Sequence, residues 1–312
     1  MRIVLVGASG FFGRYLLNAL VADGHHCVAL TRAAGRHGNL ELMPAVELVQ
    51  ADVYDSDVLA ALFKGADAVV SMAGILNESG GGGKGFHKVH CDLVEAIIRA
   101  CGKAGVSRVL HVSALNAGKG KSHYLQSKGE AEKLLQGAKG LDVTIFQPSV
   151  IFGKGDDFFN RFALMLQFAP LMPLACPKAQ LQPVYAGDVA SVMTASLDDP
   201  MTHGKSYELG GPQAYTLKEL VQWTAEQMGL KRRVVGLPAP LSATMAVLMG
   251  VVPTKPFSWD NYQSLQTPNT TKKNGFAYFG IHPRAIETLV PDYLSGSVHQ
   301  RRLHDLRARP RR

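Results

Sequence analysis

The sequence predicts an α/β protein in which helices cover both faces of a doubly wound parallel sheet. In the first half of the chain, short apolar runs alternate with stretches of helical periodicity, and the connections between them are short. This alternation is typical of strands that pair in parallel, because each helix carries the chain back to the edge where the previous strand began. A glycine-rich turn from Gly7 to Gly13 also follows the first apolar run and opens a helical pattern.

The elements of this half are expected at regular intervals. Apolar runs predict strands over Ile3–Val6, Cys27–Thr31, Val46–Gln50, Ala68–Ser71, Val109–Val112 and Val143–Gln147. Apolar spacing predicts helices over Arg14–Asp23, Asp57–Phe63, His87–Ala104 and Tyr124–Gly137. The carboxyl ends of parallel strands then meet at one edge of the sheet, which is where such folds bind nucleotides.

The pattern changes after Pro148, where loops lengthen and prolines cluster. The expected elements are a helix over Leu217–Met228 that Thr216 caps and Gly229 ends, a helix capped by Asp188, and strands over Ser206–Leu209 and Arg233–Gly236. We therefore expect a Rossmann-type nucleotide-binding domain over residues 1–150 and a smaller mixed α/β substrate or lid region over 151–298, with room for some of its elements to return to the main sheet. Residues 299–312 form a basic tail.

Composition indicates a globular protein with a substantial core, because 46% of the residues are hydrophobic and only 19% are charged. The four cysteines are scattered and none pairs with another Cys or His at zinc spacing, so we expect no disulfide framework, no metal and a reducing cytoplasm. The chain reaches its first strand directly after Met1, and no apolar run is long enough to span a membrane, so we expect no leader peptide and no membrane anchor.

The net charge of +8 is concentrated at the C-terminus. Residues 301–312 contain six arginines and one aspartate, which leaves +3 for the rest of the chain. A solvated tail is one interpretation; contact with anionic lipid, an acidic partner or nucleic acid is the other. Since nothing in the body of the chain favours base readout, we expect no nucleic-acid partner.

The glycine turn has the chemistry of a phosphate site. Gly7, Gly10 and Gly13 are spaced GxxGxxG between a strand and a helix, where the lack of side chains lets a pyrophosphate approach the helix N-terminus. A simple tight turn is the alternative. Arg32 follows the second strand, and no acidic residue lies between Asp23 and Glu41.

Arg32 points to the type of cofactor. An acidic residue at this position would bind the ribose hydroxyls of NAD, whereas a guanidinium pairs with a 2′-phosphate. Arg36 and His37 add to the basic character of this segment. The sequence therefore favours NADP(H) over NAD(H), unless Arg32 only lies in a polar loop.

A candidate catalytic set follows the fifth strand. Ser113 ends that strand, and Tyr124 and Lys128 are four residues apart, so they share one face of the next helix. A nearby ammonium lowers the pKa of a tyrosine, which would make Tyr124 a general acid or base, with Ser113 holding the substrate oxygen. A surface pair on a helix is the alternative.

These motifs resemble the extended and atypical short-chain dehydrogenase/reductase superfamily, which includes proteins described as NAD-dependent epimerase/dehydratase-like. The stretches His111–Ala117, Gln147–Gly153 and Gln182–Tyr185, with Phe158, Asn160 and Phe162, are more specifically similar to the nucleotide-binding accessory subunits of respiratory complex I and their bacterial relatives. The resemblance implies a Rossmann-type domain with bound NADP(H). The residues expected at the cofactor are Gly7, Ser9, Gly10, Phe11, Phe12, Gly13, Arg32, Asp52, Val53, Ala73, Gly74, Lys128, Pro148 and Val150.

Two main functions stay open at this point, besides a third, an NADPH-sensing regulator that would use the glycine turn without the Tyr124 and Lys128 pair. One is an NADP(H)-dependent oxidoreductase or epimerase/dehydratase that acts through Ser113, Tyr124 and Lys128 on a small or lipid-like substrate. The other is a non-catalytic accessory or assembly protein of a complex I type enzyme, cytoplasmic and peripheral to the inner membrane. The apolar stretch Leu237–Val252 forms either a buried or lid helix, or a surface helix against a membrane, an apolar substrate or a partner. Residues 79–85, rich in glycine, form a passive linker or a flap over the cofactor.

Overall fold

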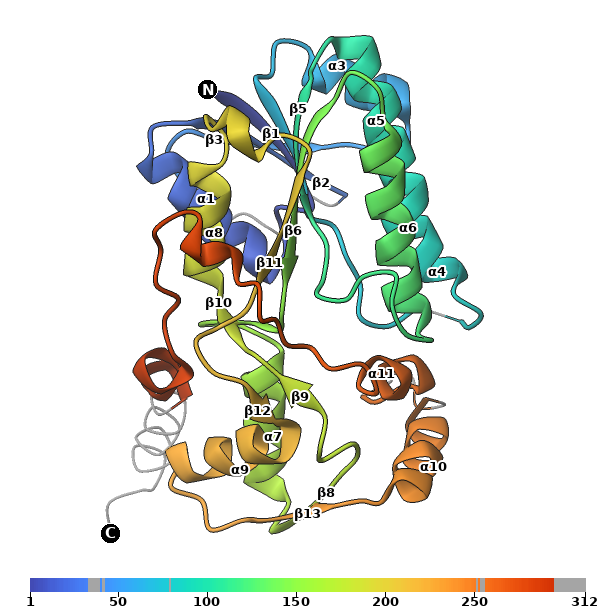
Figure 1. Cartoon of the computed structure of the whole chain (residues 1–312), viewed down its shortest axis with the longest axis vertical. Helices are drawn as coiled ribbons and strands as arrows, with labels where there is room; N and C mark the ends of the chain where they lie inside the picture. Colours follow the sequence, from blue (N-terminus) through green and yellow to red (C-terminus); the bar gives the residue numbers. More distant parts are fainter. Residues whose placement is uncertain (33–39, 41–42, 79, 251, 253–255, 295–312) are drawn as a thin grey trace, which may run out of the picture.

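The computed structural model describes residues 1–32, 40, 43–78, 80–250, 252 and 256–294. Its main layer is a sheet of seven strands in the order β11-β6-β5-β4-β1-β2-β3, and every neighbouring pair is parallel (Figure 1). The predicted doubly wound α/β fold is confirmed. The chain reverses direction across the sheet between β1 and β4, which creates the switch point where such sheets bind ligands.

The strands and helices of this layer lie close to their predicted positions. The strands are β1 (Arg2–Val6), β2 (His26–Thr31), β3 (Val46–Gln50), β4 (Ala68–Ser71), β5 (Arg108–Val112), β6 (Asp142–Pro148) and β11 (Lys205–Leu209). The helices are α1 (Phe11–Ala22), α3 (Ser56–Phe63), α4 (Lys84–His87), the π-helix η2 (Lys88–Asp92), α5 (Leu93–Ala104), α6 (His123–Gly137) and α8 (Ala186–Ala195). The helix predicted over His87–Ala104 is therefore interrupted by a π-helical turn.

Helices α1 and α8 cover one face of the sheet, and α3, α5 and α6 cover the other (Figure 1). Alternate residues of each central strand face opposite cores, as in β1, where Ile3 and Leu5 pack with α1 while Val4 and Val6 pack with α3 and α5. Because both faces are buried, the strands are nearly continuous apolar runs, and this is why they could be predicted.

Two elements from the second half of the chain complete this layer. Strand β11 pairs with β6 along its whole length, and α8 packs beside α1. Arg108 secures this return: its guanidinium donates to the Asp142 carbonyl, Thr144 Oγ1, the Ser196 carbonyl and Thr202 Oγ1. Burial lowers the pKa of Arg108 to about 10.

The remaining elements lie around the main layer and around a third hydrophobic core, which includes Phe159, Leu220 and Val290. They are β7 (Ile151–Phe152), α7 (Phe158–Phe168), β8 (Leu171–Leu174), β9 (Gln180–Leu181), β10 (Val184–Tyr185), η3 (Pro200–Thr202), β12 (Tyr215–Thr216), α9 (Leu217–Gln227), β13 (Arg233–Gly236), α10 (Ala239–Gly250), α11 (Trp259–Ser264), η4 (Gly275–Ala277) and a helix over 286–294. Three small sheets pair β7 with β10, β9 with β12 and β8 with β13.

Helix ends in this region test two predictions. Thr216 caps α9 in a capping box with Glu219, as expected. The prediction that Asp188 caps a helix is wrong, because α8 begins after Tyr185 and Asp188 lies inside its first turn. The buried Asp188 carboxylate instead accepts hydrogen bonds from the backbone N–H and Nε of Arg284 at 2.6 and 2.7 Å.

Helix α10 presents apolar side chains to solvent. Only Ser242 and Ala246 are buried, while Leu241, Val247 and Leu248 are between 54% and 67% exposed. Figure 1 shows α10 at the end of the molecule that also holds β8 and β13. Of the two interpretations left open for this stretch, the structure supports a surface helix. Among the described residues, no helix is both long and apolar enough to cross a membrane.

The packing of α1 against the first turn generates a prediction. A Cβ on Gly13 would lie 2.1 Å from the carbonyl oxygen of Ala8, a backbone atom that cannot move without displacing the turn. Gly13→Ala should therefore lower the free energy of unfolding by about 3 kcal/mol in urea denaturation. The matched control is Gly102→Ala on α5, where a Cβ meets nothing within 4 Å; it should raise stability by about 0.5 kcal/mol. Equal effects of the two changes would contradict the proposed packing.

Candidate functional site

The glycine turn is forced into position by the strand beside it. Gly7 has a φ of +95°, and a Cβ there would lie 2.7 Å from the backbone nitrogen of Ala73, which follows β4. Only glycine allows these two strand ends to approach so closely. Ala73, predicted near the cofactor, therefore lies directly against the turn, and Gly74 follows it in the chain.

Gly10 has a different role from Gly7 and Gly13. It is the N-cap of α1, and no side chain caps the N–H groups of the first helical turn. A Cβ on Gly10 would come no closer than 3.6 Å to its nearest neighbour, so packing alone does not require a glycine there. An open helix N-terminus beside an exposed glycine suits an approaching phosphate.

Two cations lie near Tyr54, which follows β3: Arg32 from the end of β2 and Lys88 from η2. Arg32, exposed directly after β2, acts electrostatically on Tyr54, although burial has the larger effect and raises the pKa of this tyrosine. The Lys88 ammonium lies 5.1 Å from the centre of the same ring. Asp52 accepts a hydrogen bond from the backbone N–H of Tyr54, beside the buried Val53. Sequence reasoning missed Lys88 and Tyr54; Arg36 and His37 lie outside the described residues.

Lys128 is buried at the carboxyl edge of the sheet. Its Nζ donates a 3.0 Å hydrogen bond to the carbonyl of Val112, the last residue of β5, and burial lowers its pKa to about 8. Ser113 comes next in the chain, and its buried Oγ has no hydrogen-bond partner among the described residues. The structure thus places two of the three predicted catalytic residues at the same strand end.

Tyr124 lies one helical turn before Lys128 on α6, after the N-cap Ser122. Its ring packs edge-on against the imidazole of His90, with centroids 5.6 Å apart. The expectation that Lys128 lowers the pKa of Tyr124 is wrong for this structure. Burial, reinforced by the Asp260 carboxylate, raises that pKa to about 12, and the ammonium of Lys128 is directed to the Val112 carbonyl.

His90 and His111 are functional candidates that sequence reasoning did not single out. Ser127 Oγ donates to the Tyr124 carbonyl and lies 2.8 Å from His90 Nδ1, so His90 Nδ1 must carry the proton in that contact. His90 Nε2 is then a buried acceptor, and it has no partner among the described residues. A Cβ on Gly74 would lie 3.5 Å from Lys128 Nζ and 3.8 Å from His90 Nε2, so Gly74 borders both groups.

His111 lies on β5 with Nδ1 3.2 Å from Ser71 Oγ, and its Nε2 is also a buried atom without a partner in the described part of the chain. Burial, and to a lesser degree the charge of Lys128, lower the pKa of His90 to about 2 and that of His111 to about 3. Both imidazoles are therefore neutral at physiological pH. No local pattern in the sequence marks these two histidines, because they approach Lys128 only when η2, β5 and α6 pack together.

The loops on either side of this edge are held in place. The Leu115 N–H donates to the carbonyl of Pro148, which joins the end of β6 to the segment after β5. On the other side, the Glu78 carboxylate accepts 2.8 Å hydrogen bonds from the N–H groups of Gly83 and Gly85, so the glycine-rich loop is fastened beside α4. Val150, half-buried, accepts from Val184 at the entry to the second region.

Comparisons with known proteins can now be set beside this geometry. A family model described as NAD(P)H-binding matches residues 7–200. The chain belongs to this NAD(P)H-binding family. It is 30% identical to NADH dehydrogenase (ubiquinone) 1 alpha subcomplex subunit 9 of Mus musculus over 90% of this chain and 76% of the relative. It is 29% identical to ceramide reductase of Caulobacter vibrioides over 79% of this chain and 77% of that protein.

A solved structure supports the fold. A double mutant of dTDP-glucose 4,6-dehydratase from Streptomyces venezuelae, with NAD bound, superposes with a TM-score of 0.73, 20% identity and 97% coverage of both chains. The resemblance to complex I accessory subunits is thus confirmed, and the solved structure shows the fold that the resemblance to the short-chain dehydrogenase/reductase superfamily implied. As a member of the NAD(P)H-binding family, the chain has the Rossmann-type fold that the sequence predicted.

The residues present fit a dinucleotide at this edge. The turn Gly7–Gly13 with Ser9, Phe11 and Phe12 faces the open end of α1, Arg32 and Asp52 lie at the ends of β2 and β3, and Lys128 lies at β5. The unpartnered Ser113 Oγ and His90 Nε2 are buried polar atoms of the kind that a ligand or ordered water usually satisfies. The arrangement can bind an anion at one end and move a proton at the other.

The buried imidazole of His111 generates a prediction about pH. Because its pKa is near 3 when folded and about 6.5 when unfolded, the unfolded chain binds the additional proton. The resulting stabilisation is complete above pH 6.5 and is lost as the pH falls toward 3. Between pH 6 and 4.5, His111→Gln should reduce the pH slope of the unfolding free energy by about 1 kcal/mol per pH unit.

Urea denaturation at several pH values measures that slope. The control is Val109→Ala, a buried change on the same strand that removes no titratable group and should leave the slope unaltered. If His111→Gln and the parent protein lose stability in parallel, His111 is not held neutral in the folded state.

Proposed function

We propose that the chain is an NADP(H)-dependent oxidoreductase that reduces a carbonyl group of a lipid-like substrate, with Tyr124 as the proton donor. One observation carries the proposal: Lys128, buried on α6, donates to the last residue of β5, and the next residue is a buried serine whose hydroxyl has no partner among the described residues. Tyr124 lies on the same face of α6 as Lys128. A helix-surface pair would be solvated, whereas Lys128 is only 4% exposed. Such burial is costly for a structural lysine and common in active sites.

Each residue has a distinct role in this proposal. Bound NADPH would supply hydride to the carbonyl carbon. The Ser113 hydroxyl donates to the substrate oxygen and orients it, and the Tyr124 phenol transfers its proton to that oxygen as negative charge develops. With its pKa raised to about 12, the phenol is protonated at neutral pH, so the proton that the substrate oxygen receives is present on Tyr124. The Lys128 ammonium, which borders Gly74, would bind the ribose of the nicotinamide nucleotide and hold the cofactor beside Ser113.

The preference for NADP(H) rests on charge at the ends of β2 and β3. Arg32 is exposed after β2, and Lys88 lies nearby against Tyr54, so a 2′-phosphate would meet two cations. In an NAD site an acidic residue lies at the end of β2. Asp52 follows β3 instead, and its carboxylate accepts a hydrogen bond from the backbone N–H of Tyr54.

Arg32→Gln should weaken NADPH binding and spare NADH. Losing one charge-assisted contact to a phosphate costs about 1.5–3 kcal/mol, so the Kd for NADPH should rise roughly 10- to 100-fold while the Kd for NADH stays within about twofold. Isothermal titration calorimetry with both cofactors measures this. Arg99→Gln on α5, which removes an exposed arginine paired with Glu95, is the control and should change neither Kd. Equal affinities of the parent protein for NADPH and NADH would refute the preference.

Two observations support a lipid-like substrate. A relative similar over most of the chain is named ceramide reductase. The outer end of the second region also exposes a group of apolar side chains that could border an acyl chain or a lipid surface: Leu164, Phe168, Leu171, Val235, Leu241, Val247 and Leu248.

Tyr124→Phe should abolish reduction and leave cofactor binding intact. Removing the proton donor should lower kcat at least about 100-fold, while the Kd for NADPH should change little because the ring is retained. The assay follows NADPH absorbance with a panel of short- and long-chain ketones. Tyr278→Phe, which removes an exposed hydroxyl bound to Asp199, is the control. A Tyr124→Phe protein with full activity would eliminate the assigned role.

A second function is favoured by similarity to the complex I subunit and by the exposed face of α10. In that case the chain is an accessory or assembly protein, peripheral to a membrane, in which the nucleotide stabilises the fold. Failure of the whole ketone panel, together with a copurifying nucleotide that never exchanges, would support this function over the first.

A further inference from the structure

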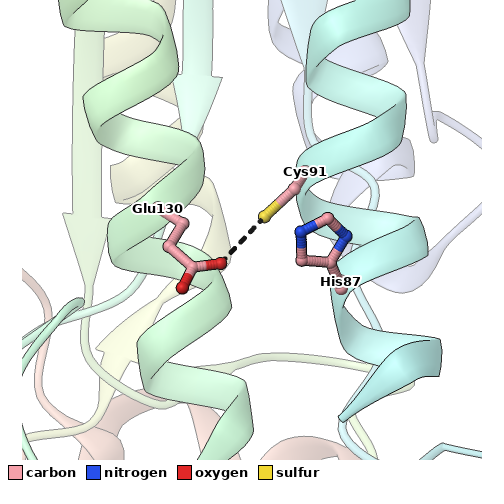
Figure 2. Close-up of side chains that lie close together, drawn as sticks. All are labelled: His87, Cys91 and Glu130. Atoms are coloured by element: carbon pink, nitrogen blue, oxygen red, sulfur yellow. Dashed lines mark hydrogen bonds between the residues drawn. The ribbon is translucent and has the colours of Figure 1, made fainter.

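Away from the cofactor edge, three side chains with metal-binding chemistry meet between η2 and α6 (Figure 2). His87 ends α4, Cys91 lies in η2 and Glu130 lies on α6. One ligand atom from each lies within 4.8 Å of the other two. The Cys91 thiol donates to Glu130 Oε2 at a distance of 3.6 Å.

We infer that His87, Cys91 and Glu130 form a binding site for Zn²⁺ with one open coordination position. Zinc accepts nitrogen, sulfur and oxygen ligands together, and sites with three protein ligands keep the fourth position for water or another small ligand. Donors around a tetrahedral zinc are about 3.3–3.8 Å apart, which the Cys91–Glu130 distance already matches. The side chains of His87 and of Asp92, which contacts its ring, are 57% and 52% exposed, so the pair can shift together to close the remaining gap.

A hydrogen bond to Asp92 orients the imidazole of His87 as a zinc ligand requires. Its Nδ1 lies 2.9 Å from Asp92 Oδ1. Figure 2 shows the other ring nitrogen facing Cys91 and Glu130. A carboxylate that accepts from one histidine nitrogen fixes the tautomer and directs the other nitrogen to the metal. This contact is separate from the three ligands and independently supports the site.

A cavity of about 250 Å³ opens beside the cluster and supplies space for the fourth ligand. His87 and Glu130 form one side of it, and the glycine-rich loop with Lys84 and His123 forms the other. The Lys84 ammonium would favour an anionic fourth ligand, such as hydroxide. Cys91, only 2% exposed, does not line the cavity, so an ion would reach its thiol past His87 and Glu130, which do.

Zinc at this site would connect the two helices that build the catalytic edge. Cys91 is adjacent to His90, and its thiol also contacts the Ser127 carbonyl, one residue before Lys128. On binding, the Cys91 S–H bond breaks, the thiolate coordinates zinc, and the proton passes to solvent; no electron is transferred. The sequence-based prediction of no metal overlooked that His87 and Cys91 are four residues apart, a spacing that suits two zinc ligands on one helical turn. The third ligand, Glu130, joins them only when α6 packs on η2.

Titration of the metal-free full-length protein with Co²⁺, followed by displacement with Zn²⁺, tests the site. We expect a thiolate-to-cobalt charge-transfer band, visible bands of a four-coordinate ion, and loss of both on adding stoichiometric zinc. Cys91→Ser should remove the charge-transfer band. Asp92→Asn should keep the band and weaken zinc affinity roughly 10- to 100-fold. The control, Cys101→Ser, alters a buried cysteine of α5 outside the cluster and should behave as the parent.

Cys91→Ser alters a buried residue, and failure of that variant to fold would remove its readout. Glu130→Gln then provides a second test, because Glu130 is exposed and its replacement does not disturb the core. It should weaken zinc affinity at least about tenfold without changing far-ultraviolet circular dichroism. The proposal is overturned if the parent protein gives no thiolate band, if the band persists in Cys91→Ser, or if Glu130→Gln binds zinc as the parent does. None of these readouts depends on enzymatic activity or on the cofactor.

Discussion

The contact between the first turn and the end of β4 determines how the rest of the molecule is arranged. Gly7 approaches the Ala73 backbone more closely than any residue with a Cβ could, and Gly13 lies against the Ala8 carbonyl in the same way. These two contacts fix where α1 begins and leave its N-terminal N–H groups uncapped by side chains. Since β1 is central in the sheet, the turn also sets the position of the neighbouring strand ends, where the polar residues gather.

A buried cation then organises the other end of this edge. Lys128 is held by a backbone carbonyl, and its charge is felt by both His90 and His111. The two imidazoles remain neutral, so they can receive hydrogen bonds from a ligand without adding charge to a dry site. The site thus combines one cation with several neutral groups, which suits a reaction in which negative charge appears on a substrate oxygen.

The sequence predicted most of the sheet and much of the cofactor edge because these depend on local patterns. Buried strands are apolar throughout, and the glycine spacing directly follows β1. Features that depend on packing between distant segments escaped prediction. The π-helical turn at η2, the raised pKa of Tyr124 beside Asp260, and the pairing of Asp188 with Arg284 each need a partner that no local pattern reveals. The apolar pattern of α10 indicated a helix but could not say whether it was covered.

The four hydrogen bonds of Arg108 have a consequence for motion. They join β5 and β6 to the segment between α8 and β11, which returns from the second half of the chain. Ser149 and Asn269 make a further crossing between the two halves. A hinge motion that separated the two halves of the chain would have to break all of these hydrogen bonds together. Opening of the site for a bulky substrate is therefore expected to come from the outer elements, such as α10 and α11, while the main sheet and the segments bonded to it stay fixed.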